Sequence, residues 1–114
     1  MKIIKAEDSH TIESTKSCIA TEYPTTSEDI NIARVKISGR FPESGVMWNT
    51  IVEEIVYVES GSGKVVIDTV VAAIKTGDVV LYQKNEKVFW EGEMTLLFAC
   101  TPAWSVQQHV FANL

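Results

Sequence analysis

The stretch Glu53-Glu54-Ile55-Val56-Tyr57-Val58-Glu59-Ser60-Gly61-Ser62-Gly63 joins an extended run to a glycine-rich segment. Side chains alternate across a strand, so Val56 and Val58 share the face of Glu54, and Glu53 points to the other face. Glycine adopts backbone conformations that other residues avoid, and two glycines in three positions predict a turn after the strand. The stretch therefore predicts a strand with one apolar face, followed by a turn.

On both sides of this stretch, short runs rich in β-branched and aromatic residues alternate with turn signals. The predicted strands cover residues 34–38, 46–52, 54–58, 65–67, 70–74, 79–82, 88–90 and 95–100. Asp68-Thr69 predicts a hairpin turn between two of them. Many short strands at this spacing, with no helical periodicity between them, indicate an all-β sandwich or barrel.

The two ends of the chain give weaker signals. Residues 2–6 and 18–22 read as candidate strands. Near the other end, Ser105 is a candidate cap for a short helical turn carrying Val106, Val110 and Phe111. No repeat, linker or low-complexity segment divides the chain, so one domain is expected.

Composition excludes several classes of function. The 114 residues carry a formal net charge of −5, which provides no basic surface for nucleic acid. No apolar run reaches the ~20 residues of a membrane span, and no signal peptide is visible, so a cytoplasmic location is expected. Cys18 and Cys100 match no metal-binding spacing, and both are expected to be buried thiols. No cofactor is predicted.

Two segments resemble the paired motifs of the cupin superfamily. Glu54 stands at the motif's metal-ligand glutamate and Gly61 at its turn glycine, and residues 77–81 followed by 88–90 are similar to the second motif. The resemblance covers residues 30–114. It implies an antiparallel double-stranded β-helix, or jelly-roll barrel, with a short C-terminal helical turn. Residues 1–114 are then a single cupin domain, with a barrel core at about 30–101, an N-terminal arm at 1–29 and a tail at 102–114.

The chain departs from the cupin motifs at the metal ligands. The two histidines of the first motif fall on Trp48 and Thr50, or on Met47 and Asn49 with the longer spacing. The histidine of the second motif falls on Val88. Transition metals need three or four N, O or S ligands at once. Glu54 is the only one of the motifs' metal ligands that this sequence keeps, so the resemblance predicts a cupin without metal.

The same pattern resembles a bacterial subgroup of cupins that lacks these histidines. The residues that carry this likeness are Glu86-Lys87-Val88-Phe89-Trp90, Pro102-Ala103-Trp104 and Gln108-His109. Such proteins are often described as similar to mannose-6-phosphate isomerase. Fold similarity alone does not carry function.

Strand parity predicts which side chains line the barrel cavity. If alternation continues from Glu54 back to Thr50 and Trp48, two tryptophans and one carboxylate surround the same space. Apolar walls with a few convergent polar groups are typical of small-ligand pockets, and tryptophan faces suit sugars. The predicted pocket consists of Trp48, Asn49, Thr50, Glu54, Val88 and Trp90.

Glu54 is the one candidate for acid–base chemistry. Burial in an apolar barrel raises a carboxyl pKa toward the range useful for proton transfer. The alternative is a structural carboxylate, solvated at the barrel mouth or paired with Arg34 or Lys87. His109 is interpreted as a surface or packing histidine on the terminal helix, and Trp104 as a packing residue.

Three functional interpretations stay open at this point. The first is a metal-free cupin that binds an unknown, carbohydrate-like small molecule, paired as a homodimer through exposed strand edges. The second is a metal-independent sugar isomerase or epimerase that uses Glu54 as acid or base. The third is a module whose barrel is filled by Trp48 and Trp90. The sequence leaves open whether the chain is an enzyme.

Overall fold

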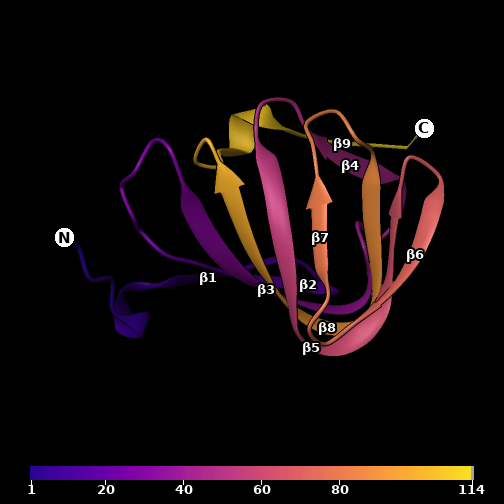
Figure 1. Cartoon of the computed structure of the whole chain (residues 1–114), viewed down its shortest axis with the longest axis horizontal. Helices are drawn as coiled ribbons and strands as arrows, with labels where there is room; N and C mark the ends of the chain where they lie inside the picture. Colours follow the sequence, from indigo (N-terminus) through magenta and orange to yellow (C-terminus); the bar gives the residue numbers. More distant parts are fainter. Residues whose placement is uncertain (114) are drawn as a thin grey trace.

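The computed structural model describes residues 1–113 and shows an antiparallel sheet curled into a half-barrel (Figure 1). The strands are β1 (His10–Thr15), β2 (Cys18–Glu22), β3 (Asn31–Phe41), β4 (Val46–Asn49), β5 (Glu53–Ile67), β6 (Val70–Lys75), β7 (Val79–Tyr82), β8 (Val88–Thr101) and β9 (His109–Ala112). Two short 3-10 helices are η1 (Ala6–Asp8) and η2 (Val106–Gln108). The predicted all-β barrel is confirmed. Leu114, the last residue of the predicted tail, lies outside the described residues.

Strand β8 forms the middle of the sheet. It pairs with β3 along one edge and with β5 along the other, and β5 continues the sheet to β6 and β7. At its first residue, Val88, β8 also meets Met47 of β4. Strand β9, from the C-terminal end of the chain, pairs antiparallel with β4. The end of the chain is thereby joined to the first part of the barrel.

Both long strands continue through segments that the sequence predicts as turns. β5 runs through residues 60–63 and β8 through residues 91–93, and Gly63 lies opposite Gly92 in their ladder. A register shift between Val58 and Ser60 and the positive φ of Gly61, +88°, bend β5 without ending it. The prediction of turns there was wrong, because glycine lets a paired strand curve as well as reverse. These bends curl the sheet into a barrel.

We expect the Gly61→Ala substitution to destabilise the fold by about 2–4 kcal/mol, combining left-handed strain with local overpacking. A Cβ at this position would collide with the carbonyl oxygen of Glu93 on β8. Gly77→Ala is the matched control, since Gly77 has a similar φ of +94° but open space around it. Chemical denaturation should show a loss of only about 1–2 kcal/mol for the control. Equal losses in the two variants would contradict the close approach of β5 and β8.

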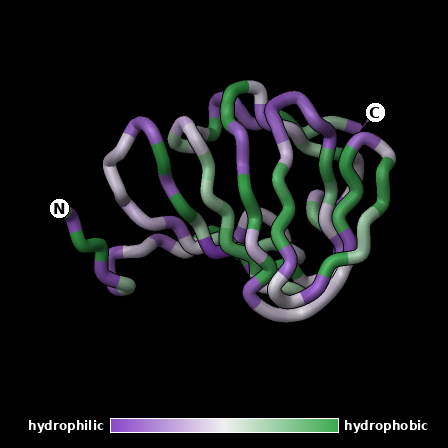
Figure 2. The backbone as a smooth tube through the Cα atoms, in the orientation of Figure 1, coloured by the Kyte–Doolittle hydropathy of each residue, from purple (hydrophilic) through white to green (hydrophobic). Residues whose placement is uncertain are grey.

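The core lies on the concave face of the curled sheet, and the strands alternate between hydrophobic and hydrophilic residues (Figure 2). Its largest fully buried side chains are Trp90, Tyr82, Ile37 and Leu96. Trp90 makes edge-on contacts with Tyr82 and Phe98, at ring-centroid distances of 6.2 and 5.6 Å. Large aromatic side chains therefore fill much of the barrel interior.

The C-terminal segment differs in part from the prediction. The predicted helical turn exists as η2, but Ser105 makes no side-chain cap and Val110 and Phe111 belong to β9. His109 opens this strand and is not part of a helix. The free edge of β4 offers backbone hydrogen bonds to an extended segment, which outweighs the weak preference for a second helical turn.

Candidate functional site

Polar side chains from five elements meet at one end of the barrel. Strand pairing places Glu54 opposite both Tyr82 of β7 and Cys100 of β8, and it places Asn49 opposite His109. Residues directly opposite each other in a ladder share one face of the sheet. The resulting rim cluster consists of Asn49, Glu54, Tyr82, Gln108 and His109.

The carboxyl group of Glu54 lies at the centre of the rim cluster. Its residue is 5% exposed, and its Oε1 accepts hydrogen bonds from Asn49 Nδ2 at 2.5 Å and from the Tyr82 hydroxyl at 3.1 Å. Burial raises the pKa of Glu54, and the two hydrogen bonds oppose that rise without cancelling it. Glu54 therefore holds a proton at higher pH than an exposed glutamate does.

Gln108 connects the cluster to the backbone between β4 and β5. Its Oε1 accepts hydrogen bonds from the backbone N–H groups of Ile51 and Val52, at 3.2 and 3.3 Å. Its Nε2 donates to Asn49 Oδ1 at 2.9 Å. Gln108 is 3% exposed, so both ends of its amide are used inside the protein.

His109 lies on the other side of the Asn49 amide from Glu54. Its Nδ1 is 2.9 Å from Asn49 Oδ1, and its ring packs between Trp104 and Phe111 at centroid distances of 5.5 and 4.6 Å. Burial lowers the pKa of His109 to about 4. The imidazole is therefore neutral near pH 7, which leaves one ring nitrogen able to accept a proton.

Two further ionisable groups near Glu54 stay protonated. The pKa of Tyr82 is raised well above its usual value by burial and by the neighbouring carboxylate. Burial, followed by the charge of Glu54, raises the pKa of Cys100 to about 11. The Cys100 thiol also points to Asn31 Oδ1, at 2.8 Å. Because a thiolate is the reactive form of cysteine, Cys100 is not set up as a nucleophile.

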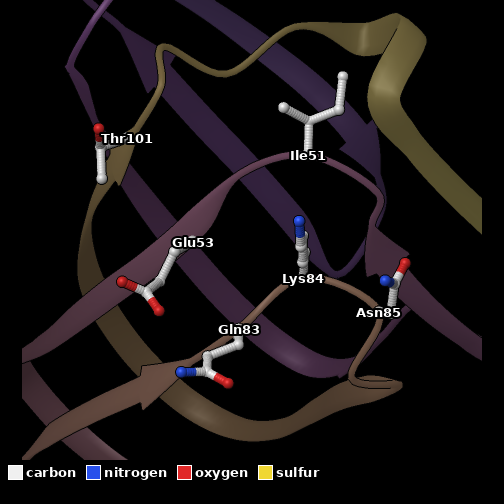
Figure 3. A pocket seen from close by; sticks show the side chains of 6 residues that line it. All are labelled: Ile51, Glu53, Gln83, Lys84, Asn85 and Thr101. Atoms are coloured by element: carbon white, nitrogen blue, oxygen red, sulfur yellow. The ribbon is translucent and has the colours of Figure 1, made fainter.

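A cleft of about 450 Å³ lies between the start of β5, the loop after β7 and the end of β8 (Figure 3). It is lined by Ile51, Glu53, Gln83, Lys84, Asn85 and Thr101. Two of these residues hydrogen-bond to the cluster through their backbone N–H groups, Ile51 to Gln108 Oε1 and Asn85 to the carbonyl oxygen of Asn49, so this mouth cleft adjoins the cluster. Its volume falls in the range of small-ligand pockets.

The predicted pocket residues lie in different places. Asn49 and Glu54 are in contact, and Val88 and Trp90 are buried in the barrel interior. Trp48 and Thr50 do not share the face of Glu54: Trp48 packs under Lys87 Nζ at 4.8 Å, and Thr50 is exposed. Their predicted inward placement was wrong, because β4 ends at Asn49 and bends at residues 50 and 51 break the alternation. The longer of the two motif spacings therefore describes the inward positions, Met47 and Asn49.

Sequence reasoning missed three members of the rim cluster. Tyr82 ends a predicted strand whose inward face was not assigned, and its parity with Val80 was the available signal. Gln108 and His109 were noted only as part of the resemblance, and His109 was interpreted as a surface or packing residue. Its half-buried ring does pack against aromatic side chains, but it also reaches the amide that contacts Glu54.

The side chains around Glu54 do not fit the metal that many cupins hold. No group of three or more His, Cys, Asp and Glu residues suited to a metal ion occurs within residues 1–113. Met47, Asn49 and Tyr82 occupy the surrounding inward positions, and the Asn49 amide separates His109 from Glu54. Zinc and related metals require several N, O or S ligands on one centre.

Comparisons with solved structures place the chain among known barrels. Streptomyces PAC13, described as a unique nucleoside dehydratase and also solved with uridine, superposes with a TM-score of 0.89 at 17% identity. That match covers 100% of this chain and 92% of PAC13. KdgF from Halomonas sp. gives a TM-score of 0.73 at 12% identity, covering 94% of this chain and 98% of KdgF.

The polyketide cyclase RemF from Streptomyces resistomycificus gives a TM-score of 0.69 at 14% identity, covering 89% of this chain and 79% of RemF. No protein-family model matches the sequence, and no curated protein matches it. At these identities the structural likeness concerns the fold alone. PAC13, KdgF and RemF are all cupin-type barrels, and the chain has the cupin fold.

Proposed function

We propose that this cupin-fold chain binds a small polar molecule, carbohydrate-like in its hydroxyl groups, at the barrel mouth and moves a proton on it without a metal ion. The observation that carries the proposal is the buried carboxyl of Glu54, held by two donors in the cluster that adjoins the mouth cleft. Glu54 itself lines a second, smaller cleft of about 240 Å³. This joins the predicted binding function to the predicted role of Glu54 as acid or base.

The state of Glu54 suits proton transfer. A general acid or base works best when its pKa lies near the working pH, and burial moves the pKa of Glu54 in that direction. Isomerisation, epimerisation and elimination of water each remove and return protons and need no oxidant. His109 lies one amide away from Glu54, so a second ionisable group accompanies the carboxyl at this site.

The lining of the mouth cleft favours a ligand with many hydrogen-bonding groups. Glu53, Gln83, Asn85 and Thr101 offer both donors and acceptors, and Lys84 offers a cation. The likeness to PAC13, described as a nucleoside dehydratase and solved with uridine, supports sugar-containing molecules as the first class to test. The identity of the ligand is the part of the proposal that the experiment must supply.

The experiment measures binding and proton exchange separately. Purified chain is screened against sugars, sugar phosphates and nucleosides by thermal shift, and each ligand that stabilises it is incubated with the chain in D₂O. We expect deuterium to replace a carbon-bound hydrogen of at least one ligand, seen by NMR. Binding without exchange would leave a binding protein and reject the catalytic half of the proposal. If none of these compounds raises the melting temperature of the chain, the proposed ligand class is rejected.

The Tyr82→Phe variant is expected to shift the pH dependence of exchange upward. Phenylalanine keeps the ring but removes a hydrogen bond that favours the ionised form of Glu54, so the pKa of Glu54 rises further. The rate is expected to fall by about tenfold, near the lower range for loss of one hydrogen bond to a charged group. Tyr57→Phe is the matched control, because Tyr57 is exposed on the outer face of β5. Identical pH profiles in both variants would contradict a role for the Tyr82 hydroxyl.

Cellular location and pairing of copies stay predictions. None of the helices in residues 1–113 has the length and apolar character needed to cross a membrane. Apolar side chains on the outer faces of β5 and β7, those of Ile55, Val79 and Leu81, are about half exposed or more. This apolar face is distinct from the strand edges through which the homodimer is predicted to pair.

A further inference from the structure

We propose that Gln108 and Asn49 hold His109 as the tautomer protonated on Nδ1, which makes its Nε2 the second proton acceptor of the site. The tautomer follows from hydrogen-bond directions alone. The role of Nε2 as an acceptor of ligand protons rests on the proposed function.

The series of hydrogen bonds that fixes the tautomer begins at the backbone. The N–H groups of Ile51 and Val52 can only donate, so the Gln108 atom that they contact must be its oxygen. The other end of the Gln108 amide is then the NH₂ group, which also can only donate. Its contact with Asn49 therefore requires the Asn49 oxygen.

The orientation of Asn49 fixes the groups on both sides of it. With its oxygen toward Gln108, its NH₂ group faces Glu54 and donates to Oε1. The same Asn49 oxygen lies 2.9 Å from His109 Nδ1, and two acceptors do not form a hydrogen bond. His109 must therefore carry a hydrogen on Nδ1. The donor role of two backbone N–H groups therefore determines, through the amides of Gln108 and Asn49, which nitrogen of His109 carries the hydrogen.

The environment of His109 supports a fixed neutral ring. Burial lowers its pKa to about 4, so near pH 7 the ring carries one hydrogen and that hydrogen is on Nδ1. Trp104 and Phe111 pack against the ring and hinder its rotation. Within residues 1–113 no hydrogen bond uses Nε2, which keeps its lone pair. A neutral imidazole with a free Nε2 can accept a hydrogen there, although burial makes it a weaker base than an exposed imidazole.

The two proton carriers complement each other. Burial makes the Glu54 carboxylate a stronger base than that of an exposed glutamate, whereas it keeps His109 neutral, with a lone pair on Nε2 that is open to a hydroxyl hydrogen of the ligand. In an isomerisation the Glu54 carboxylate takes the carbon-bound proton of the ligand and returns it to the neighbouring carbon, and Nε2 takes the hydroxyl proton and returns it to the carbonyl oxygen. Each group gives back the proton that it takes, so the balance needs no oxidant and no metal.

The test reads the tautomer directly by long-range ¹H–¹⁵N correlation NMR of the imidazole rings. In the unmodified chain, His109 is expected to show a protonated Nδ1 and an unprotonated Nε2. His10, which is exposed on β1, provides the internal reference for a ring free in solvent. A His109 protonated on Nε2 in the unmodified chain would overturn the inference without any variant.

Two variants test the role of Gln108. Gln108→Glu can still accept from Ile51 and Val52 but cannot donate, so the Asn49 amide is expected to turn and His109 to switch to the Nε2-protonated form. Gln108→Met brings no charge into the buried position and is expected to lose the fixed tautomer. Retention of the Nδ1-protonated form in either folded variant would contradict the claim that Gln108 fixes the His109 tautomer through Asn49. A confirmed tautomer with no deuterium exchange on any bound ligand would reject the proposed function and the second-acceptor role, and would leave the tautomer standing.

Discussion

The Trp90→Ala variant is expected to lose about 3–5 kcal/mol of unfolding free energy, the range measured when a buried aromatic is truncated in a core. Trp90 is fully buried and contacts Tyr82 and Phe98 inside the barrel. The curled sheet is paired along both edges of β8, so it cannot collapse far into the space that an indole leaves. For a chain of this size we expect the melting temperature to fall by roughly 15 °C.

Two other tryptophan variants test whether the loss of stability follows the buried volume that is removed. Trp48→Ala is expected to cost only about 1 kcal/mol, because Trp48 is half-buried and its specific contact is the Lys87 ammonium. Trp90→Phe should cost about 1–2 kcal/mol, since most of the ring volume remains and an unpaired group is removed. Within residues 1–113 the Trp90 Nε1 has no hydrogen-bond partner. Thermal and chemical denaturation of the three variants give the ranking.

The ranking also separates two of the functional interpretations for Trp90. A core residue makes stability fall with the volume removed, and added indole should restore part of the melting temperature of Trp90→Ala by filling the cavity. A wall of an open ligand pocket would instead show a small loss of stability and a large loss of ligand-induced stabilisation. That second outcome would contradict the filled interior described above.

The strand pattern could be predicted because its signals are local. Val56 and Val58 alternate with outward residues, and Asp68-Thr69 forms the predicted hairpin turn between β5 and β6 with positive φ at both residues. The continuity of a strand through glycine is not a local property. Gly61 bends β5 without ending it because Gly63 and Gly92 allow the facing strands to approach. A single sequence gives no sign of which glycines face each other.

The rim cluster could be predicted only in part, for the same physical reason. Glu54 was found from its motif and its strand parity, and Asn49 was placed beside it. His109 is 60 positions from Asn49 in the chain, and a ladder between β4 and the C-terminal strand brings them together. The parity error at Trp48 and Thr50 arose at a bend of two residues that no hydrophobic pattern marks. Non-local pairing and irregular bends therefore limit what one sequence reveals about a site.

The Glu54→Gln variant is expected to exchange ligand hydrogen about 10²–10⁴ times more slowly than the unmodified chain, the range for loss of a positioned acid or base. Glutamine keeps an oxygen that can accept from Asn49 and Tyr82, so the rim cluster can stay assembled while the group loses its titratable proton. The exchange is measured in D₂O with the ligand that the screen identifies. Glu43→Gln is the matched control, because Glu43 is exposed and lies outside the cluster.

The same variant is expected to be more stable than the unmodified chain near pH 7. Because burial raises the pKa of Glu54 in the folded state, the unfolded chain ionises first as pH rises. Stability is then fully present below the unfolded pKa and is lost progressively until the pH passes the folded pKa. Glutamine never ionises, so its advantage should appear at neutral pH and vanish near pH 4. A structural carboxylate that stabilises the barrel through its charge predicts the opposite sign, and a Glu54→Gln variant less stable at pH 7 would rule out the acid–base assignment of Glu54.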